Sequence, residues 1–307
     1  MTRGAVARGV AAVSAAVLAG SALVAGAVPA SGSGSGCAVW REKRIAYSLG
    51  ILEALLPDNR GGMLISGGDG VERLTPDGQI KTLAKVDSAG QIVWWSKNEV
   101  MFPTGDALAS GALSRADGTL KILNLDTHKL RTYASGLTMP NGLALDRDRT
   151  AYVTRDTGTG TGITRISAKP GHRITTNWST LSDTNGIAID SKRRVMYVDR
   201  TFEVNAPVMR IPMAHPNHST EIADLSRSGG IGLKLLDDLF MWHRVLYIPA
   251  NGGSELYSVD TRTGHTCLIA SGLGNPSDVT VGTGHGWRKG ALFVSGFDGT
   301  VREFVRT

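Results

Sequence analysis

The chain has 307 residues, of which 41% are hydrophobic and 20% are charged, and this composition argues against disorder over most of its length. The formal net charge of +6 comes from Lys and Arg residues scattered along the chain, and only 6% of the residues are aromatic. A nucleic-acid groove combines a basic stripe with stacking side chains, so no nucleic-acid partner is expected. The charged residues are instead expected to form a solvated surface.

Residues 1–30 have the pattern of a cleaved signal peptide for export. Arg3 and Arg8 precede a run rich in Ala, Val, Leu and Gly that extends to Val28, and the small residues that end at Ala30 suit a signal peptidase. The apolar run is also long enough to span a bilayer, so an uncleaved membrane anchor is an alternative. With the signal cleaved, we expect a secreted, extracellular protein without stable membrane insertion.

Residues 31–37 form a Ser- and Gly-rich spacer before the folded domain, which we place at 38–307. Lipidation at Cys37 is a further alternative, although the residues before it lack the apolar position of a lipobox. Cys37 and Cys267 are the only cysteines. In an exported protein such a pair favours a disulfide over a zinc site, which needs more Cys or His ligands at set spacings.

Two stretches of the chain repeat the same order of residue types. They are "LTMPNGLALDRDRTAYVTRDT" at 137–157 and "LSDTNGIAIDSKRRVMYVDRT" at 181–201. Each contains Asn-Gly, an alternating apolar strand, a charged turn and a second apolar strand. Two interpretations are open: Asn-Gly serves only as a turn, or Asn141 and Asn185 point at a shared centre.

Related units fill the rest of the chain at intervals of about 40 to 50 residues, a period typical of propeller blades. Units open at Glu53, Asp237 and Asp278, and a less regular one occupies 90–130. No segment after residue 50 has helical periodicity over three turns. The pattern predicts an all-β protein, a six-bladed β-propeller, because six units of short strands can close into a ring with few exposed edges.

Ring closure has a candidate device at the start of the domain. Residues 38–47, "AVWREKRIAY", precede the first repeat and are predicted to add the outer strand of the last blade. That arrangement places Cys37 at the rim of the ring beside Cys267. The disulfide and the closure are then expected to be a single device.

The first strand of each blade lines the central channel of a propeller, so the residues that open the repeats are expected to converge near one end of it. These residues are Glu53, Asn141, Asn185, Asp237 and Asp278. Carboxylate and amide oxygens without Cys or His suit a hard cation, either Ca²⁺ with six to eight ligands or Mg²⁺ and Mn²⁺ with six.

From about residue 48 onward the chain resembles the senescence marker protein/gluconolactonase/luciferin-regenerating-enzyme family of six-bladed propellers. The resemblance rests on "TNGIAIDSKRRVMYVDRTFEVNAPVMRIPM", "LDDLFMWHRVLYIPANGG", "LEALLPDNRGGMLIS" and "MPNGLALD". It implies that Asn185, Asp237 and Glu53 hold a metal ion. It also implies that Asp237 is the catalytic base, with Asp238 as the alternative, and that Asn141 orients the substrate.

The resemblance implies an exported metal-dependent lactonase or esterase. Ca²⁺ is the first choice for the metal, with Mg²⁺, Mn²⁺ or Zn²⁺ as alternatives. Met139 and Gly142 flank Asn141 where the sugar-acid lactonases of the family carry Arg and Asp, so the lactone or small ester substrate stays open. The sequence does not indicate an oligomeric state.

Two other functions remain open at this stage. The first is a non-catalytic binding propeller, because the same fold serves scaffolds and receptors. The second is an enzyme similar to the strictosidine-synthase-like propellers. The chain has no Gly-x-Ser-x-Gly motif, which argues against a serine esterase of the α/β-hydrolase fold.

Overall fold

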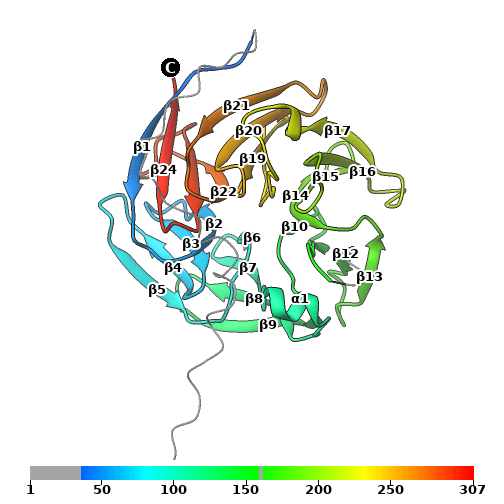
Figure 1. Cartoon of the computed structure of the whole chain (residues 1–307). Helices are drawn as coiled ribbons and strands as arrows, with labels where there is room; N and C mark the ends of the chain where they lie inside the picture. Colours follow the sequence, from blue (N-terminus) through cyan, green and yellow to red (C-terminus); the bar gives the residue numbers. More distant parts are fainter. Residues whose placement is uncertain (1–35, 159–161) are drawn as a thin grey trace, which may run out of the picture.

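The computed structural model describes residues 36–158 and 162–307, and these form six four-stranded antiparallel sheets arranged in a ring (Figure 1). The predicted six-bladed β-propeller is confirmed. The export signal expected at 1–30 and most of the spacer expected at 31–37 lie outside the described residues. No helix in the described part of the chain is long and apolar enough to cross a membrane.

The first three blades follow the order of the chain. Blade one consists of β2 (Leu52–Pro57), β3 (Met63–Gly67), β4 (Gly70–Leu74) and β5 (Ile80–Ala84). Blade two consists of β6 (Val93–Ser96), β7 (Glu99–Thr104), β8 (Gly118–Asn124) and β9 (Leu130–Leu137). Blade three consists of β10 (Leu143–Leu145), β11 (Ala151–Val153), β12 (Ile163–Ile166) and β13 (Ile174–Ser179).

The last three blades complete the ring. Blade four consists of β14 (Thr184–Asp190), β15 (Val195–Arg200), β16 (Pro207–Pro212) and β17 (Thr220–Asp224). Blade five consists of β18 (Phe240–Trp242), β19 (Val245–Ala250), β20 (Glu255–Asp260) and β21 (Thr266–Ser271). Blade six consists of β22 (Pro276–Val281), β23 (Leu292–Gly296), β24 (Val301–Arg306) and β1 (Trp40–Ala46). Among the described residues the helices are α1 (Leu108–Ala112) and the 3₁₀ helix η1 (Leu225–Arg227).

Strand β1 closes the ring as predicted. It pairs antiparallel with β24, with Trp40 opposite Arg306, so the N-terminal strand forms the outer edge of the last blade. Cys37 and Cys267 form a disulfide whose Cα atoms are 5.7 Å apart, and Cys267 lies on β21 of blade five. Inside the closure, buried Arg302 of β24 pairs with Glu42 of β1 at 3.0 Å. The pairing of β1 with β24, the disulfide and the ion pair together hold the first strand of the domain against the last blades of the ring.

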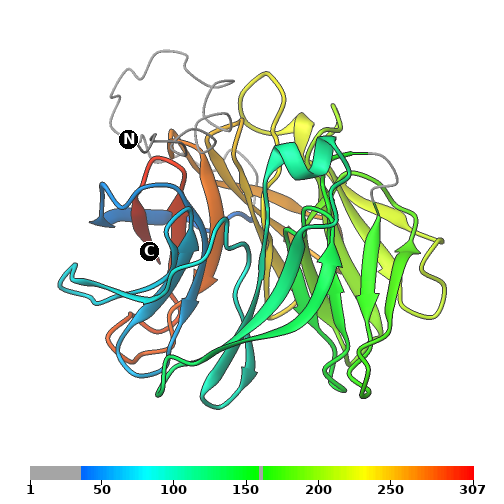
Figure 2. The ribbon, with the colours of Figure 1, turned by 90° about the horizontal axis from the view of Figure 1, so that it is seen from below.

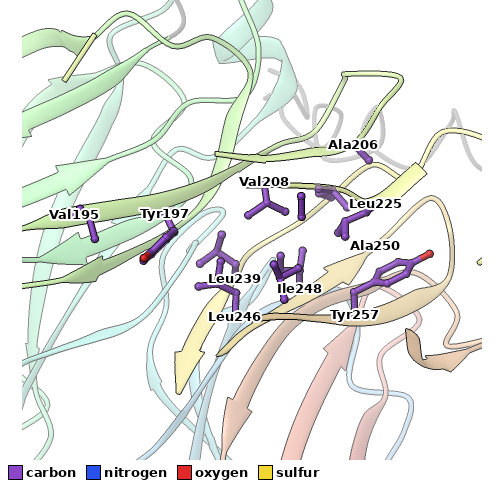
Figure 3. Close-up of a cluster of buried hydrophobic side chains, with 13 residues drawn as sticks. Val195, Tyr197, Ala206, Val208, Leu225, Leu239, Leu246, Ile248, Ala250 and Tyr257 are labelled. Carbon is purple, nitrogen blue, oxygen red and sulfur yellow. The ribbon is translucent and has the colours of Figure 1, made fainter. Parts of the chain in front are cut away.

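The core of the molecule lies between neighbouring blades rather than at the axis. Blades four and five, for example, bury Val208, Leu239, Leu246 and Ile248 between their faces (Figure 3). Because each blade is covered on both faces, a middle strand such as β3 is buried along its whole length. This explains why the second strand of each repeat reads as a short, nearly continuous apolar run.

The antiparallel order of the strands brings two kinds of loop to one end of the ring. These are the loops from the second to the third strand of a blade and the loops that enter the next blade. We call this end the mouth face. In Figure 2, α1 and the yellow segment that contains η1 lie at this same end. Loops of the mouth face carry the residues described next.

Candidate functional site

The structure brings the three predicted metal ligands together at the mouth end of the channel. Glu53 lies on β2, Asn185 lies on β14, and Asp237 lies three residues before β18. Asn185 Nδ2 donates a hydrogen bond to Asp237 Oδ1 at 3.2 Å. Burial raises the pKa of Glu53 well above its ordinary value, and the negative charges of nearby carboxylates, including Asp237, raise it further. Glu53 of blade one therefore lies within electrostatic reach of the Asn185–Asp237 pair, which joins blades four and five.

Asn141, the predicted substrate-orienting residue, is linked to the same region by a hydrogen bond to Asp106, a residue that was not among the predicted site residues. It lies just before β10 and is buried. Its Nδ2 atom donates to Asp106 Oδ2 at 3.1 Å. After burial, the negative charge of Asp106 contributes most to the raised pKa of Glu53, so Asn141 and Asp106 belong to one polar cluster with Glu53.

The Asn-Gly pairs are not turns. Asn185 and Gly186 lie inside β14, so the turn-only interpretation is wrong for this pair. A Cβ atom on Gly186 would stand 2.4 Å from the backbone nitrogen of Leu239, and one on Gly142 would stand 2.4 Å from the carbonyl oxygen of Asn185. Glycine follows each asparagine because the next blade packs directly against the backbone at that point.

Three more carboxylates, Asp106, Asp156 and Asp199, join the site from positions that the repeat pattern did not single out. They lie at or after the ends of the second strands β7, β11 and β15, whereas the predicted residues open the first strands. Asn251 follows β19 in the equivalent place, and its Nδ2 atom lies 3.4 Å from Asp237 Oδ2. An Asp or Asn therefore recurs at or just after the end of the second strand in four successive blades, and this recurrence can be read from the sequence.

Asp278 has a different role from the other residues that open a repeat. Its Oδ2 atom accepts a hydrogen bond from the backbone nitrogen of Leu55 at 2.7 Å, and its Oδ1 atom accepts from Val279 at 2.6 Å. Both oxygens are thus used by the backbone. Asp278 fastens blade six to blade one, and its charge adds to the field of the channel.

The channel concentrates negative charge in a buried setting. Burial is the main cause that raises the pKa of seven carboxylates in and around the channel. Repulsion by other members of the group raises the pKa further for five of them: Glu53, Asp106, Asp199, Asp237 and Asp238. The pKa rises to about 7 for Asp156, about 8 for Asp237 and about 7 for Asp278. The pKa values of the other four are also raised well above their ordinary values: Glu53, Asp106, Asp199 and Asp238. Such a cluster favours the uptake of protons or of a cation.

Several acceptor oxygens of this cluster lack hydrogen-bond donors. Within residues 36–158 and 162–307, the buried acceptors without a partner include Asn185 Oδ1, Asp156 Oδ1, Asp199 Oδ2 and Asp238 Oδ1. An unpaired buried acceptor is destabilising by roughly 1–3 kcal/mol. A divalent cation supplies the missing positive partner, and an all-oxygen set is the kind that Ca²⁺, Mg²⁺ and Mn²⁺ accept. Glu53, Asn185 and Asp237 thus fit a cation.

We expect the cation-free protein to lose stability as the pH rises. Raised pKa values mean that the folded protein holds more protons than the unfolded chain between about pH 4 and about pH 8. The stabilisation is therefore present on the acidic side and is lost as the pH passes the pKa values of about 7 for Asp156 and about 8 for Asp237. Thermal unfolding in chelator should show a lower Tm at pH 8 than at pH 5. A Tm that rises over this interval would contradict the electrostatic description.

Solved structures that are similar to this propeller include proteins with different names and roles, whereas no family profile and no curated protein sequence matches the chain. A gluconolactonase from Xanthomonas campestris is 15% identical, with a TM-score of 0.68 over 92% of this chain and 97% of that chain. A virginiamycin B lyase from Staphylococcus aureus is 12% identical, with a TM-score of 0.57 over 87% and 100%. A chain of the nidogen/laminin complex is 14% identical, with a TM-score of 0.56 over 71% and 79%. At these identities the likeness shows the propeller fold alone.

Proposed function

We propose that the protein is a cation-dependent hydrolase that acts on a lactone or small ester at the mouth of the channel. The observation that carries this proposal is the Asn185–Asp237 pair, which leaves Asn185 Oδ1 buried and unpaired among the described residues. The charge of Asp237 also acts on Glu53 and raises its pKa. The shared fold with a gluconolactonase supports it. The cation is Ca²⁺ by preference, with Mg²⁺, Mn²⁺ or Zn²⁺ as alternatives.

The residues of the site have distinct tasks in this proposal. A bound cation would supply positive charge beside the carbonyl group, where negative charge develops during hydrolysis. Asp237 Oδ1 is fixed by Asn185 Nδ2 and by the backbone nitrogen of Asp238, at 3.2 and 3.1 Å. Within the described part of the chain, Asp237 Oδ2 has only the long contact with Asn251, so it is the oxygen we assign to accept the proton of the attacking water.

Asn141 is assigned to orient the substrate. Its Nδ2 atom is held by Asp106, so its amide plane is fixed relative to the mouth of the channel. A fixed amide can direct the carbonyl group of a substrate toward Asp237, and such positioning contributes to rate through effective concentration.

The test is hydrolysis of a panel of lactones and aryl esters by the purified protein, followed by pH-stat. We expect activity that disappears after dialysis against chelator and returns with one of the four cations. Activity that is insensitive to chelator would contradict the cation requirement. The absence of hydrolysis with all four cations would leave the binding propeller as the better description.

We also propose that the protein is secreted. The disulfide between Cys37 and Cys267 supports this localisation, because disulfides persist mainly in oxidising compartments outside the cytoplasm. N-terminal sequencing of the protein from culture medium is expected to find a new terminus after Ala30.

A further inference from the structure

Large apolar side chains are exposed on three loops of the mouth face. The loop between β7 and β8 carries α1, the second loop joins β15 to β16, and the third joins β17 to β18. Ile231 is fully exposed and Val204 is 76% exposed. We define the apolar rim as the six exposed residues Leu108, Leu113, Phe202, Val204, Ile231 and Leu233. Exposed large apolar side chains on several loops of one face are candidates for an interaction surface.

Each of these loops also carries or adjoins a carboxylate of the candidate site. Asp106 lies two residues before α1, Asp199 lies near the end of β15, and Asp237 lies within the third loop, three residues before β18. The chain thus places an apolar side chain within a few residues of an acidic one in three different blades. The channel mouth combines an acidic centre with apolar surroundings.

The loop that carries Ile231 is held in place by a buried ion pair. Lys234 is 1% exposed, and its Nζ atom lies 2.7 Å from Glu255 Oε2 and donates to the carbonyl oxygen of Gly230 at 2.7 Å. The backbone nitrogen of Gly230 donates to Glu255 Oε1 at 2.6 Å. Burying two charged groups is unfavourable unless the two groups pair closely and further hydrogen bonds satisfy them. The Lys234–Glu255 pair and its hydrogen bonds to Gly230 fix the turn next to Ile231, whose apolar side chain is exposed to solvent.

The other two loops are fastened by arginines. Arg155 donates to the carbonyl oxygen of Gly111, in α1, at 3.2 Å. Arg200 pairs with Asp183 at 3.1 Å and with Glu203 at 2.6 Å. Like Lys234, these two cations are engaged by the protein itself. They are therefore poorly placed to recognise an anionic or polyhydroxylated ligand.

We propose that the apolar rim binds an uncharged apolar chain or aryl group of the substrate, while the ester or lactone group reaches the acidic centre. This inference rests on the proposed function and names its substrate class as hydrophobic lactones or esters. Charge complementarity favours a neutral ligand, because the carboxylates of the centre repel fatty acids and anionic lipid surfaces. Full burial of a methylene strengthens binding by up to about fourfold.

The test measures binding without turnover. Unreactive δ-lactams with and without an octyl chain are titrated by calorimetry into the wild-type protein and into the Ile231→Ser and Phe202→Ser variants. Ile80→Ser is the matched control, because Ile80 is also exposed but starts the outer strand β5, away from the mouth face. All three variants change exposed side chains, and thermal unfolding checks that they fold.

We expect the octyl lactam to bind at least tenfold more tightly than the parent lactam in the wild type and in Ile80→Ser. In each rim variant this ratio should fall at least threefold. A ratio that stays the same in the rim variants, or a wild type that does not bind the octyl lactam at millimolar concentration, overturns the inference.

Two other results would assign the rim to a different partner and also overturn the inference. One is co-sedimentation with phosphatidylcholine vesicles that the rim variants abolish. The other is a dimer in sedimentation velocity that the rim variants disperse. Failure of the lactone panel bears on the proposed function alone, whereas hydrolysis without any preference for longer chains removes this inference and leaves the proposed function intact.

Discussion

Replacement of Asp237 by Asn is expected to lower lactone turnover by about 10²- to 10⁴-fold, the usual effect of losing a general base. The substitution preserves size and one oxygen but removes a negative charge that repels its neighbours. Burial raises the pKa of Asp237 to about 8, so its ionised form destabilises the cation-free folded protein. We therefore expect the Tm of the cation-free Asp237→Asn protein to equal or exceed that of the wild type. Initial rates and thermal unfolding on the same samples measure both effects.

Two companion variants make this result specific. Asp69→Asn changes an exposed carboxylate between β3 and β4, on the mouth face, and should leave turnover unchanged. Asp238→Asn tests the alternative base, because Asp238 is buried beside Asp237. A loss of turnover in Asp238→Asn but not in Asp237→Asn would move the base by one residue. Full activity in both variants would remove the general-base role from this pair.

Loss of the disulfide is expected to have the largest effect on stability. The bond joins residues separated by 230 positions, so it restricts almost the whole unfolded chain. The chain-entropy relation gives a stabilisation of about 5 kcal/mol for a loop of this length. For a domain of this size, that corresponds to a fall in Tm of roughly 10–20 °C. Calorimetric scans of a Cys37→Ser/Cys267→Ser double variant measure it.

The control is the wild type treated with a thiol reductant, which should approach the Tm of the double variant. Thiol titration of denatured, unreduced wild type should find no free thiol. Two free thiols, or a double variant as stable as the wild type, would contradict the closure described for blade six.

The sequence predicted the fold well because a propeller repeats its pattern. The stretches at 137–157 and 181–201 revealed the period, and the apolar second strands followed from burial on both faces of each blade. Closure by residues 38–47 was predictable because a strand remained before the first repeat. Blade two was recognised only as an irregular unit, since its second and third strands are separated by a loop that contains α1.

The candidate site was predicted in part. Glu53, Asn185 and Asp237 open first strands, so their convergence followed from the architecture. Asp106 and Asp156 did not stand out because one Asp after a strand is also a common turn residue. Their membership depends on blade geometry that a single repeat does not show.

The apolar rim and its anchors were not predictable by the same reasoning. Charged residues were expected to be solvated, and this expectation is wrong for Lys234 and Arg302, which are 1% and 3% exposed. Lys234 pairs with Glu255 of β20, and Arg302 pairs with Glu42 of β1, and both partners are distant in the sequence. The exposure of Ile231 likewise depends on how its loop leaves the blade, which no local pattern encodes.

Cation binding to the free protein tests the central claim most directly, because it needs no substrate. Chelator-treated wild type and Asn185→Ala are titrated calorimetrically with Ca²⁺, Mn²⁺, Mg²⁺ and Zn²⁺ near neutral pH. Asn205→Ala is the control, since Asn205 lies in a mouth-face loop and bonds Glu221 rather than the channel carboxylates. We predict that the wild type and Asn205→Ala bind a cation alike and that Asn185→Ala binds it at least about tenfold more weakly. A wild type that binds none of the four cations, or an Asn185→Ala variant with unchanged affinity, would contradict the account.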